Sequence, residues 1–568
     1  MLGRYLYLCG KQYPVHRFLA GTRHAHRTQR AILLEKIRRN AESDFGRQHR
    51  FDEIRGVEDF RRRIPVTTYE YFRPYVERVK QGEISAMFGP GTQVMMFSMT
   101  SGTTAESKYI PITNHFFREY RKSWNIWGSR VFWHHPDLVV KHTLQFSSDW
   151  QQFHTSGGIP CGNVSGLAAE TRPLISRPAF ILPAALNKVG GTANKQYAAL
   201  RLALPSRRVG MIVTANPLTL LNLARCADRH RESLIRDLFD GTLSEQMDVP
   251  NGVRKTLRRR LARRHPRRAR QLEKLVEATG HLFPRDFWPK MSVLAVWMGG
   301  SVGGYLPKVR EYYGDAVFRD HGLSASEGRM TTPMDDRTTA GVLDYVTHFF
   351  EFIPEGEHDR PDPTVLEAHE LEEGKDYYIL LTTSSGLYRY DIHDVVRCVG
   401  YRGECPLLEF ISKGSHFSSL AGEKLSEFQV VTGVQAALAD TGLSAEHFTL
   451  APIPGDPPTY VLLLEEQLDS DTEQRLSRRV DMRLSEVNCE YEDRLQSNRL
   501  RGVSIQQVPP GSWDSLRRES LSRPGASAEQ YKHPFLTSKT GLVSHRPTTT
   551  QGRLLPDDGT TGGGDRCQ

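Results

Sequence analysis

Residues 94–108 read VMMFSMTSGTTAESK. The first six letters are a short apolar run that predicts a buried strand, and a turn rich in serine, glycine and threonine follows at once. Similar apolar runs recur near segments with helical periodicity, at 209–217 (VGMIVTANP), 291–300 (MSVLAVWMGG) and 317–328 (VFRDHGLSASEG). Apolar strands separated by helices favour a largely parallel sheet, so we expect an α/β fold.

The second half of the chain has a different texture. Residues 365–411 alternate around a turn at Ser385 and Gly386, which predicts an antiparallel or barrel-like region. The polar, glycine- and serine-rich segment 412–427 predicts a hinge. Beyond it come a helix, two strands and a long helix with apolar positions from Leu476 to Leu495, a pattern typical of a small α+β domain.

These features predict a domain organisation. We expect a large N-terminal domain at 1–411, a hinge at 412–427 and a C-terminal α+β domain at 428–543. Residues 544–568 are rich in glycine, threonine, proline and charge, which predicts a disordered tail.

The basic charge of the chain is local. The 568 residues carry a formal net charge of +9, and the stretch RKTLRRRLARRHPRRAR at 254–270 accounts for it. Such a stretch is consistent with a solvated helical face or with a phosphate or membrane-surface contact. It has no interleaved aromatic residues, so we do not expect a nucleic-acid partner.

Cysteine usage and hydropathy bear on the compartment. The seven cysteines include no C-x-x-C pair, which argues against a disulfide framework or a structural zinc. No apolar stretch is long enough to span a membrane, and the N-terminal residues show no signal-peptide pattern. We expect a cytoplasmic protein; the sequence indicates no oligomeric state.

The turn after the first apolar run has the chemistry of a phosphate cradle. Glycine allows backbone N–H groups to converge on one point, hydroxyls add donors, and a lysine adds a mobile positive charge. The alternative is an ordinary surface turn. The candidate residues are Thr100, Ser101, Gly102, Thr103, Thr104 and Lys108.

The run at 317–328 ends in small residues and a glutamate. Ligands of open α/β sheets bind at the carboxyl edge, where Ser324, Ala325 and Ser326 would leave room for a planar base. Glu327 could bind Mg²⁺ as a hard oxygen ligand. The alternative is a plain strand-to-helix turn with a glutamate that the helix dipole favours.

A further carboxylate follows in the segment YRYDIHDVV at 388–396. Asp394 stands at the mouth of an apolar strand and could accept hydrogen bonds from the two hydroxyls of a ribose. The alternative is a surface aspartate paired with Arg389 or Arg397.

Taken together, these segments occur in the order typical of one family. TSGTTxxxK, SASEG, FFEFIP at 349–354 and YRYxxxDVV resemble the acyl acid–amido synthetases, which include the plant enzymes that conjugate auxin and jasmonate to amino acids. The family belongs to the adenylate-forming superfamily. Flanking matches extend the resemblance over residues from roughly 20 to 540, and HFSSLAGEKLSE is more similar to the bacterial branch.

The resemblance implies a large adenylate-forming domain with a mobile C-terminal lid, and it implies ATP and Mg²⁺. The loop residues and Lys108 would hold phosphates, Glu327 would lie near Mg²⁺, and Asp394 would bind the ribose. Lys424 and Lys532 would bring positive charge from the lid. The substrates implied are a small carboxylic acid and an amine, in this family an amino acid.

Some positions depart from the family pattern. Ala105 and His393 replace glycines, and Leu323 replaces a tyrosine. The residues identify neither the acid, the amine nor the general base for amide formation. An acyl-CoA ligase, which shares the adenylation step, and a non-catalytic ATP-binding relic of the family remain open as alternatives.

Overall fold

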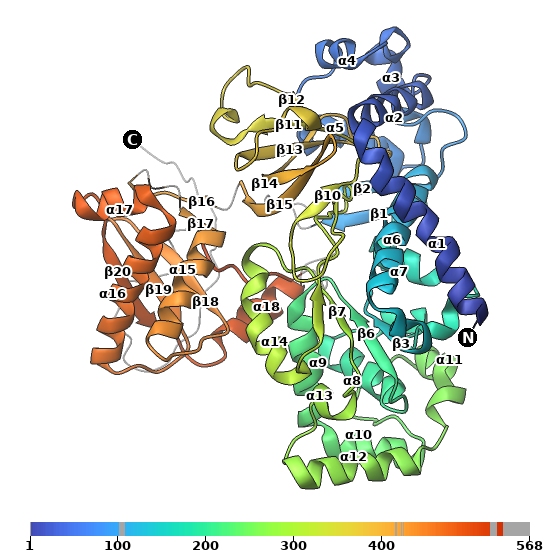
Figure 1. Cartoon of the computed structure of the whole chain (residues 1–568), viewed down its shortest axis with the longest axis vertical. Coiled ribbons are helices and arrows are strands. Elements are labelled where there is room, and N and C mark those ends of the chain that lie inside the picture. Colours follow the sequence, from blue (N-terminus) through green and yellow to red (C-terminus); the bar gives the residue numbers. More distant parts are fainter. Residues whose placement is uncertain are drawn as a thin grey trace, which may run out of the picture. The chain divides into compact units, whose positions relative to one another are not determined.

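The computed structural model describes residues 2–100, 108–414, 417–421, 423, 425–522 and 531–537. They form two compact units, and most of their helices and strands are labelled in Figure 1. Of the described residues, the first unit contains those up to 417 together with 426–432, 517–522 and 531–533, and the second contains those within 418–425, 433–516 and 534–537.

One sheet of the first unit is parallel throughout, with the strand order β3-β6-β7-β8. Its strands are β3 (His142–Gln145), β6 (Val209–Val213), β7 (Val293–Ala295) and β8 (Val317–Arg319). Every residue of β6 is buried, as expected for a strand covered on both faces. The α/β class predicted from the three later apolar runs is confirmed.

The first apolar run forms β1 (Val94–Thr100), which belongs to another sheet, of order β2-β1-β5-β4. β1 pairs antiparallel with β2 (Lys108–Thr113) and parallel with β5 (Pro160–Gly162), and β4 (Phe153–His154) forms the far edge. Because β1 has an antiparallel neighbour on one side and a parallel neighbour on the other, this sheet is mixed rather than parallel.

The barrel-like region is a seven-stranded antiparallel sheet of order β12-β11-β13-β14-β15-β10-β9. Its strands are β9 (Thr331–Thr332), β10 (Gly341–Leu343), β11 (Phe349–Pro354), β12 (Leu366–Glu367), β13 (Asp376–Thr382), β14 (Tyr390–Arg402) and β15 (Cys405–Lys413). β14 and β15 are long and irregular in register, which lets them bend. This sheet confirms the antiparallel or barrel-like region predicted for residues 365–411.

Helices surround these sheets (Figure 1). The longer ones of the first unit are α1 (Leu2–Gly21), α2 (Ala25–Arg39), α4 (Val57–Arg63), α5 (Tyr69–Lys80), α6 (Asn114–His134), α7 (Val164–Glu170), α8 (Thr192–Ala203), α9 (Pro217–Arg229), α10 (Arg231–Asp240), α11 (Asn251–Leu261), α12 (Pro266–Thr279) and α14 (Leu306–Tyr313). Shorter ones are α3 (Asp44–Gln48) and α13 (Pro284–Phe287).

The second unit is built on an α+β pattern. Strands β18 (Phe448–Ile453), β19 (Thr459–Leu464) and β20 (Arg501–Gln507) form one sheet in that order. The predicted long helix is two helices, α16 (Ser470–Val487) and α17 (Cys489–Gln496). Asn488 separates them because its backbone is extended and its side chain caps Tyr491 N–H.

Along the sequence, the boundaries between the two units fall within or next to two helices and a short sheet. Helix α15 (Glu427–Asp440) and helix α18 (Ser512–Ser522) each contribute residues to both units. Strands β16 (Phe417–Ser418) and β17 (Leu425–Ser426) form a two-stranded sheet. The described residues 517–522 and 531–533 belong to the first unit, whereas the sequence analysis placed them in the C-terminal domain. The hinge at 412–427 stays a prediction.

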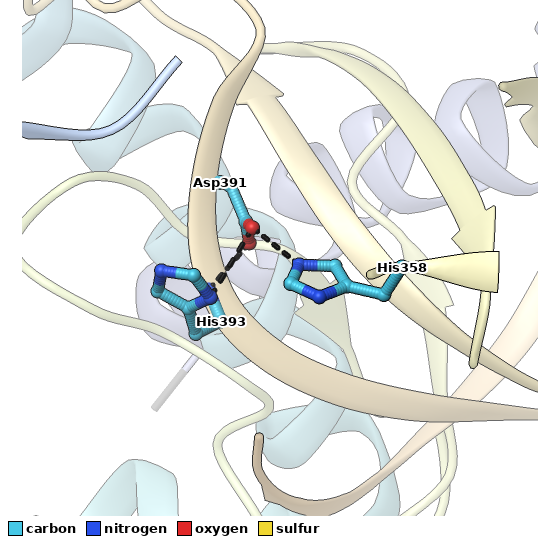
Figure 2. A group of neighbouring side chains, drawn as sticks. All are labelled: His358, Asp391 and His393. Carbon is cyan, nitrogen blue, oxygen red and sulfur yellow. Dashed lines mark hydrogen bonds and ion pairs between the residues drawn. The ribbon is translucent and has the colours of Figure 1, made fainter. Parts of the chain in front are cut away.

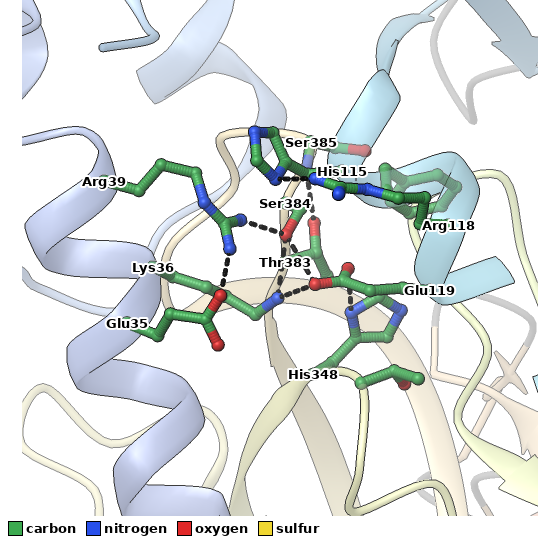
Figure 3. Close-up of polar contacts among 12 residues, drawn as sticks. Glu35, Lys36, Arg39, His115, Arg118, Glu119, His348, Thr383, Ser384 and Ser385 are labelled. Atoms are coloured by element: carbon green, nitrogen blue, oxygen red, sulfur yellow. Dashed lines mark hydrogen bonds and ion pairs between the residues drawn. The ribbon is translucent and has the colours of Figure 1, made fainter. Parts of the chain in front are cut away.

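A buried polar cluster ties the helices of the first unit to the antiparallel sheet (Figure 3). Lys36 on α2 is 2% exposed, and its Nζ lies 2.7 Å from Glu119 Oε1 on α6 and 2.8 Å from Ser384 Oγ. Ser384 Oγ in turn donates to Glu119 Oε1.

Within the described residues, no helix is long and apolar enough to cross a membrane.

Candidate functional site

Lys108 begins β2, directly opposite Thr100 at the end of β1. Its Nζ donates to the Tyr390 hydroxyl at 3.2 Å, which joins the hairpin to β14. Burial lowers the pKa of the Lys108 ammonium, and the negative charge of Glu327 opposes that shift. Ser101, Gly102, Thr103 and Thr104 lie outside the described residues, and of Thr100 only the backbone is described.

The segment from Ser324 to Arg329 closes on itself. Ser324 and Arg329 form an isolated β-bridge, and Ala325 N–H donates to Gly328 O at 2.8 Å. The next element is β9, so the alternative of a plain strand-to-helix turn does not describe this segment. Ser326 Oγ accepts a hydrogen bond from Ser98 of β1 at 2.9 Å, which fixes the segment beside the strand that leads into the predicted phosphate loop.

Glu327 is 4% exposed. Burial raises the pKa of this carboxyl, while the positive charges of Lys413 and Lys108 act against the rise. Among the described residues, no lysine, arginine or histidine nitrogen lies within 4 Å of its oxygens. A buried carboxylate without a contacting cation is costly, so this position fits a site completed by a bound cation.

Asp394 lies on β14 and is 6% exposed. Its cross-strand partner is Lys413 of β15, whose Nζ lies 3.8 Å from Asp394 Oδ1. Burial raises the pKa of Asp394, and both Lys413 and Lys532 oppose this.

The two arginines that offered an alternative explanation for Asp394 have other partners. Arg389 pairs with Glu351 at 3.0 Å, and Arg397 pairs with Asp376 at 2.7 Å. Asp394 is therefore not a surface aspartate held by either of them.

Lys532 lies in the first unit, close to these groups. Its Nζ is 3.9 Å from the ring centroid of Trp297, a cation–π distance. The preceding residue is anchored, because Asn216 donates its side-chain amide to Tyr531 O at 2.6 Å. The residue as a whole is exposed, but the loss of water around its ammonium lowers the pKa of Lys532. Lys424 lies outside the described residues.

A cluster that the sequence analysis missed lies beside Asp394 (Figure 2). Asp391 of β14 is 4% exposed, and its carboxylate contacts His358 Nε2 at 2.6 Å and His393 Nδ1 at 3.2 Å. The spacing of two between Asp391 and His393 along a strand was the signal that could have indicated a shared face. His358 had none, since it lies 33 residues earlier in the chain.

The site thus combines lysine ammonium groups with buried carboxylates. Lys108, Lys413 and Lys532 supply positive charge. Lys413 and Lys108 oppose the rise in the pKa of Glu327, and Lys413 and Lys532 oppose the rise in the pKa of Asp394. Cations of this kind suit a polyphosphate, and a carboxylate at a strand end suits ribose hydroxyls. Lys413 and Trp297 were not identified from the sequence, because their roles depend on strand pairing and packing.

The chain matches three consecutive domain families along its length. The GH3 family N-terminal domain matches residues 14–318, the GH3 family central domain residues 341–413, and the GH3 family C-terminal domain residues 428–541. The chain therefore belongs to the GH3 family, and the resemblance drawn from its motifs is confirmed.

Individual relatives agree with this assignment. A rice protein (Oryza sativa subsp. japonica) named probable indole-3-acetic acid-amido synthetase GH3.4 is 27% identical over 550 residues, which cover 90% of this chain and 86% of the relative. Jasmonoyl–L-amino acid synthetase JAR4 of Nicotiana attenuata is 24% identical over 93% of this chain and 94% of its own. The solved structure of GH3.15 acyl acid amido synthetase has the same fold, with a TM-score of 0.81 at 21% identity over 92% of this chain and 94% of that chain.

Proposed function

We propose that this protein is an ATP-dependent ligase that joins a small carboxylic acid to an amine through an acyl-adenylate. The observation that carries the proposal is the meeting of Lys108, Glu327 and Asp394, from three separate sequence motifs, in one charged site of the first unit. The relatives are named for the conjugation of acids to amino acids, so the amine we propose is an amino acid.

Each site residue receives a role in this proposal. Asp394 would accept hydrogen bonds from the ribose, and Ser324, Ala325 and Ser326 would frame the adenine and the α-phosphate. Lys108 and the loop from Thr100 to Thr104 would hold the phosphates, with Lys532 and Lys424 adding charge. Lys413, which faces Asp394 across the sheet, would hold that carboxylate in its ionised form.

Mg²⁺ is the second proposed cofactor. Glu327 fits it, because the buried carboxylate has a hard oxygen donor and lacks a cation within contact distance among the described residues. When bound, the metal would neutralise phosphate charge. The chain's own part is to hold the Glu327 oxygens beside Lys108 and to keep water from them.

The chemistry follows from what an acid needs in order to acylate an amine. The substrate carboxylate attacks the α-phosphorus of ATP in line, and the P–O bond to pyrophosphate breaks. This step depends on positioning and charge neutralisation, which the lysines supply. The amine then attacks the acyl carbon of the adenylate, and AMP leaves with the carboxyl oxygen.

The test separates these steps. With a panel of carboxylic acids, we expect acid-dependent exchange of labelled pyrophosphate into ATP for at least one acid, and amide formation when an amino acid is added. Lys108→Met should abolish the exchange because the phosphates lose a half-buried cation. Lys274→Met, at an exposed position on α12, is the matched control and should behave as the unmodified protein.

Other results would indicate the alternatives. A folded protein that binds ATP without exchange for any acid would be a non-catalytic relic of the family. Exchange followed by thioester formation with coenzyme A, and no amide, would indicate an acyl-CoA ligase. The cytoplasmic location is likewise a proposal, which fractionation of the producing cells would test.

A further inference from the structure

The carboxylate of Asp391 organises two histidines in different ways (Figure 2). Its Oδ2 accepts from His358 Nε2 at 2.6 Å and lies 3.2 Å from His393 Nδ1. Its Oδ1 accepts the backbone N–H of His393 at 2.7 Å. A carboxylate held by a side chain and a backbone group in this way has a fixed orientation, and the ring of His393 lies within ion-pair distance of it.

The two rings differ in their charge state. The hydrogen bond to Asp391 raises the pKa of His358, which favours the protonated form of this ring beside the carboxylate. The pKa of His393 is lowered, first by burial and then by the neighbouring charges of His358, Lys108 and Lys413, against the influence of Asp391. His393 is therefore neutral at pH 7.

The neutral ring has a defined tautomer. Nδ1 lies 3.2 Å from Asp391 Oδ2, and the tautomer with its proton on Nδ1 is favoured because a lone pair there would face a negative charge. Nε2 then has a free lone pair, and Figure 2 shows this second nitrogen directed away from Asp391. The His393 side chain is 40% exposed while that of Asp391 is 4% exposed, so the free nitrogen belongs to the accessible part of the cluster.

The backbone of His393 is also unusual. Its φ is +58°, in the left-handed region that favours glycine, and glycine is the residue that the family pattern leads one to expect there. A non-glycine residue in this region costs free energy. Such residues persist where the surrounding structure holds them, and they cluster at functional sites. His393 directly precedes Asp394, and the positive charge of Lys108 contributes to the lowering of its pKa.

We propose that His393 is the general base that accepts the proton of the attacking amine, with Asp391 as its positioning residue. The inference rests on the proposed function and adds the step for which the sequence offered no residue. The C–N bond forms as the C–O bond to AMP breaks, and one proton moves from the nitrogen to His393 Nε2. No other reactant is required. Relatives with glycine here must move that proton by another route, so the inference concerns this chain.

His393→Gly is the decisive variant, because glycine relieves the left-handed backbone and should not impair folding. Acyl-adenylate is first formed on the enzyme, and amide release is then followed in a single turnover after an amino acid is added. We expect the aminolysis rate to fall about 10²-fold, the lower range for loss of a general base, and added imidazole to restore part of it. Pyrophosphate exchange should fall far less than aminolysis.

The pH dependence supplies a readout that a structural role would not change. In the unmodified protein, aminolysis at a constant concentration of unprotonated amine should decline as the pH falls through the lowered pKa of His393, and this decline should be absent in His393→Gly. His369→Gln, at an exposed histidine of the same unit, is the matched control.

The outcomes are distinguishable. Equal aminolysis by His393→Gly and the unmodified protein, with normal exchange in both, would overturn the base assignment alone. A lack of exchange in the unmodified protein with every acid would overturn the proposed function and the base with it. Equal losses of exchange and aminolysis, without imidazole rescue, would make His393 a structural residue and overturn the inference.

Discussion

At the scale of the residue, Asp394 combines burial with a functional charge. Because burial raises its pKa in the folded protein, the ionised carboxylate destabilises the fold at pH values above the unfolded-state pKa. This disfavoured charge is the one that we propose binds the ribose.

Asp394→Asn should therefore separate function from stability. We expect ATP affinity to fall by about 1.5–3 kcal/mol, or more than tenfold, because one charged hydrogen bond is lost. The free energy of unfolding at pH 7 should stay equal or rise, since the raised pKa means that the buried charge is unfavourable. Nucleotide titration and calorimetry measure the two quantities. Unchanged ATP affinity with a lower melting temperature would make Asp394 a structural partner of Lys413.

Lys532 offers a second prediction at this scale. Its ammonium lies on Trp297 beside Asp394 and is proposed to be used mainly in the transition state of adenylation. Lys532→Ala should slow pyrophosphate release by about 10²–10³, by analogy with the loss of one transition-state donor, and leave ATP binding nearly intact.

The control for Lys532 keeps the charge. Lys532→Arg preserves the cation over Trp297 and should retain most of the adenylation rate, which stopped-flow pyrophosphate detection would show. An adenylation rate of Lys532→Ala within about threefold of the unmodified protein would place Lys532 outside the chemistry, since effects of this kind are normally far larger.

At the scale of the element, the arginines of the basic stretch 254–270 fall into two groups, those bound to backbone carbonyls and those exposed to solvent. Arg254 on α11 donates to the carbonyls of Leu243, Ser244, Met247 and Val249, and Arg268 on α12 is buried and donates to those of Leu204 and Phe287. Arg258, Arg259 and Arg267 are exposed. Part of the basic stretch is thus structural and part is a solvated helical face.

The Lys36–Glu119–Ser384 cluster joins α2, α6 and the turn after β13 (Figure 3). Lys36→Met should lower the free energy of unfolding by up to about 3 kcal/mol, because it leaves the half-buried Glu119 without its cation. The double variant Lys36→Met/Glu119→Leu should recover a large part of that loss, since a buried pair can often be replaced by apolar residues.

Denaturant titration of these two variants and of the single variant Glu119→Leu measures the coupling. Glu35→Gln, which changes an exposed charge on the same helix, should alter the stability little. If the double variant were as unstable as the sum of its single changes, the two side chains would act independently and the cluster would not be a unit.

At the scale of the whole molecule, the proposed nucleotide residues of the described chain all lie in one unit. Lys108, Glu327, Asp394 and Lys532 belong to the first unit, and none belongs to the sheet β18–β20 of the second. A ligand stabilises the part of a protein whose folded form it binds. ATP should therefore protect the first unit preferentially.

Amide hydrogen exchange tests this expectation. With saturating ATP and Mg²⁺, we expect slower exchange in β2, in residues 322–329 and in β14, and little change in β19. GTP at the same concentration is the control, because the site is proposed to frame adenine. Protection confined to the second unit would contradict the assignment of the nucleotide site.

Much of this organisation was predictable from the chain alone. The apolar runs at 209–217, 291–300 and 317–328 became β6, β7 and β8, because a continuous apolar run bounded by turns is a local property of a buried strand. The family assignment and the choice of Lys108, Glu327, Asp394 and Lys532 also came from local motifs. The pairing of β1 with β2 did not, since periodicity does not indicate which strand lies next to which.

What the sequence by itself determined is the family, the α/β class and the residue types that carry charge. Only the tertiary structure decided which of those charges meet. It placed Lys413 opposite Asp394, Trp297 under Lys532, and His358 on the carboxylate that orients His393. The physical reason is that strand and helix signals depend on neighbouring residues, whereas these contacts join segments far apart in the chain through register and packing.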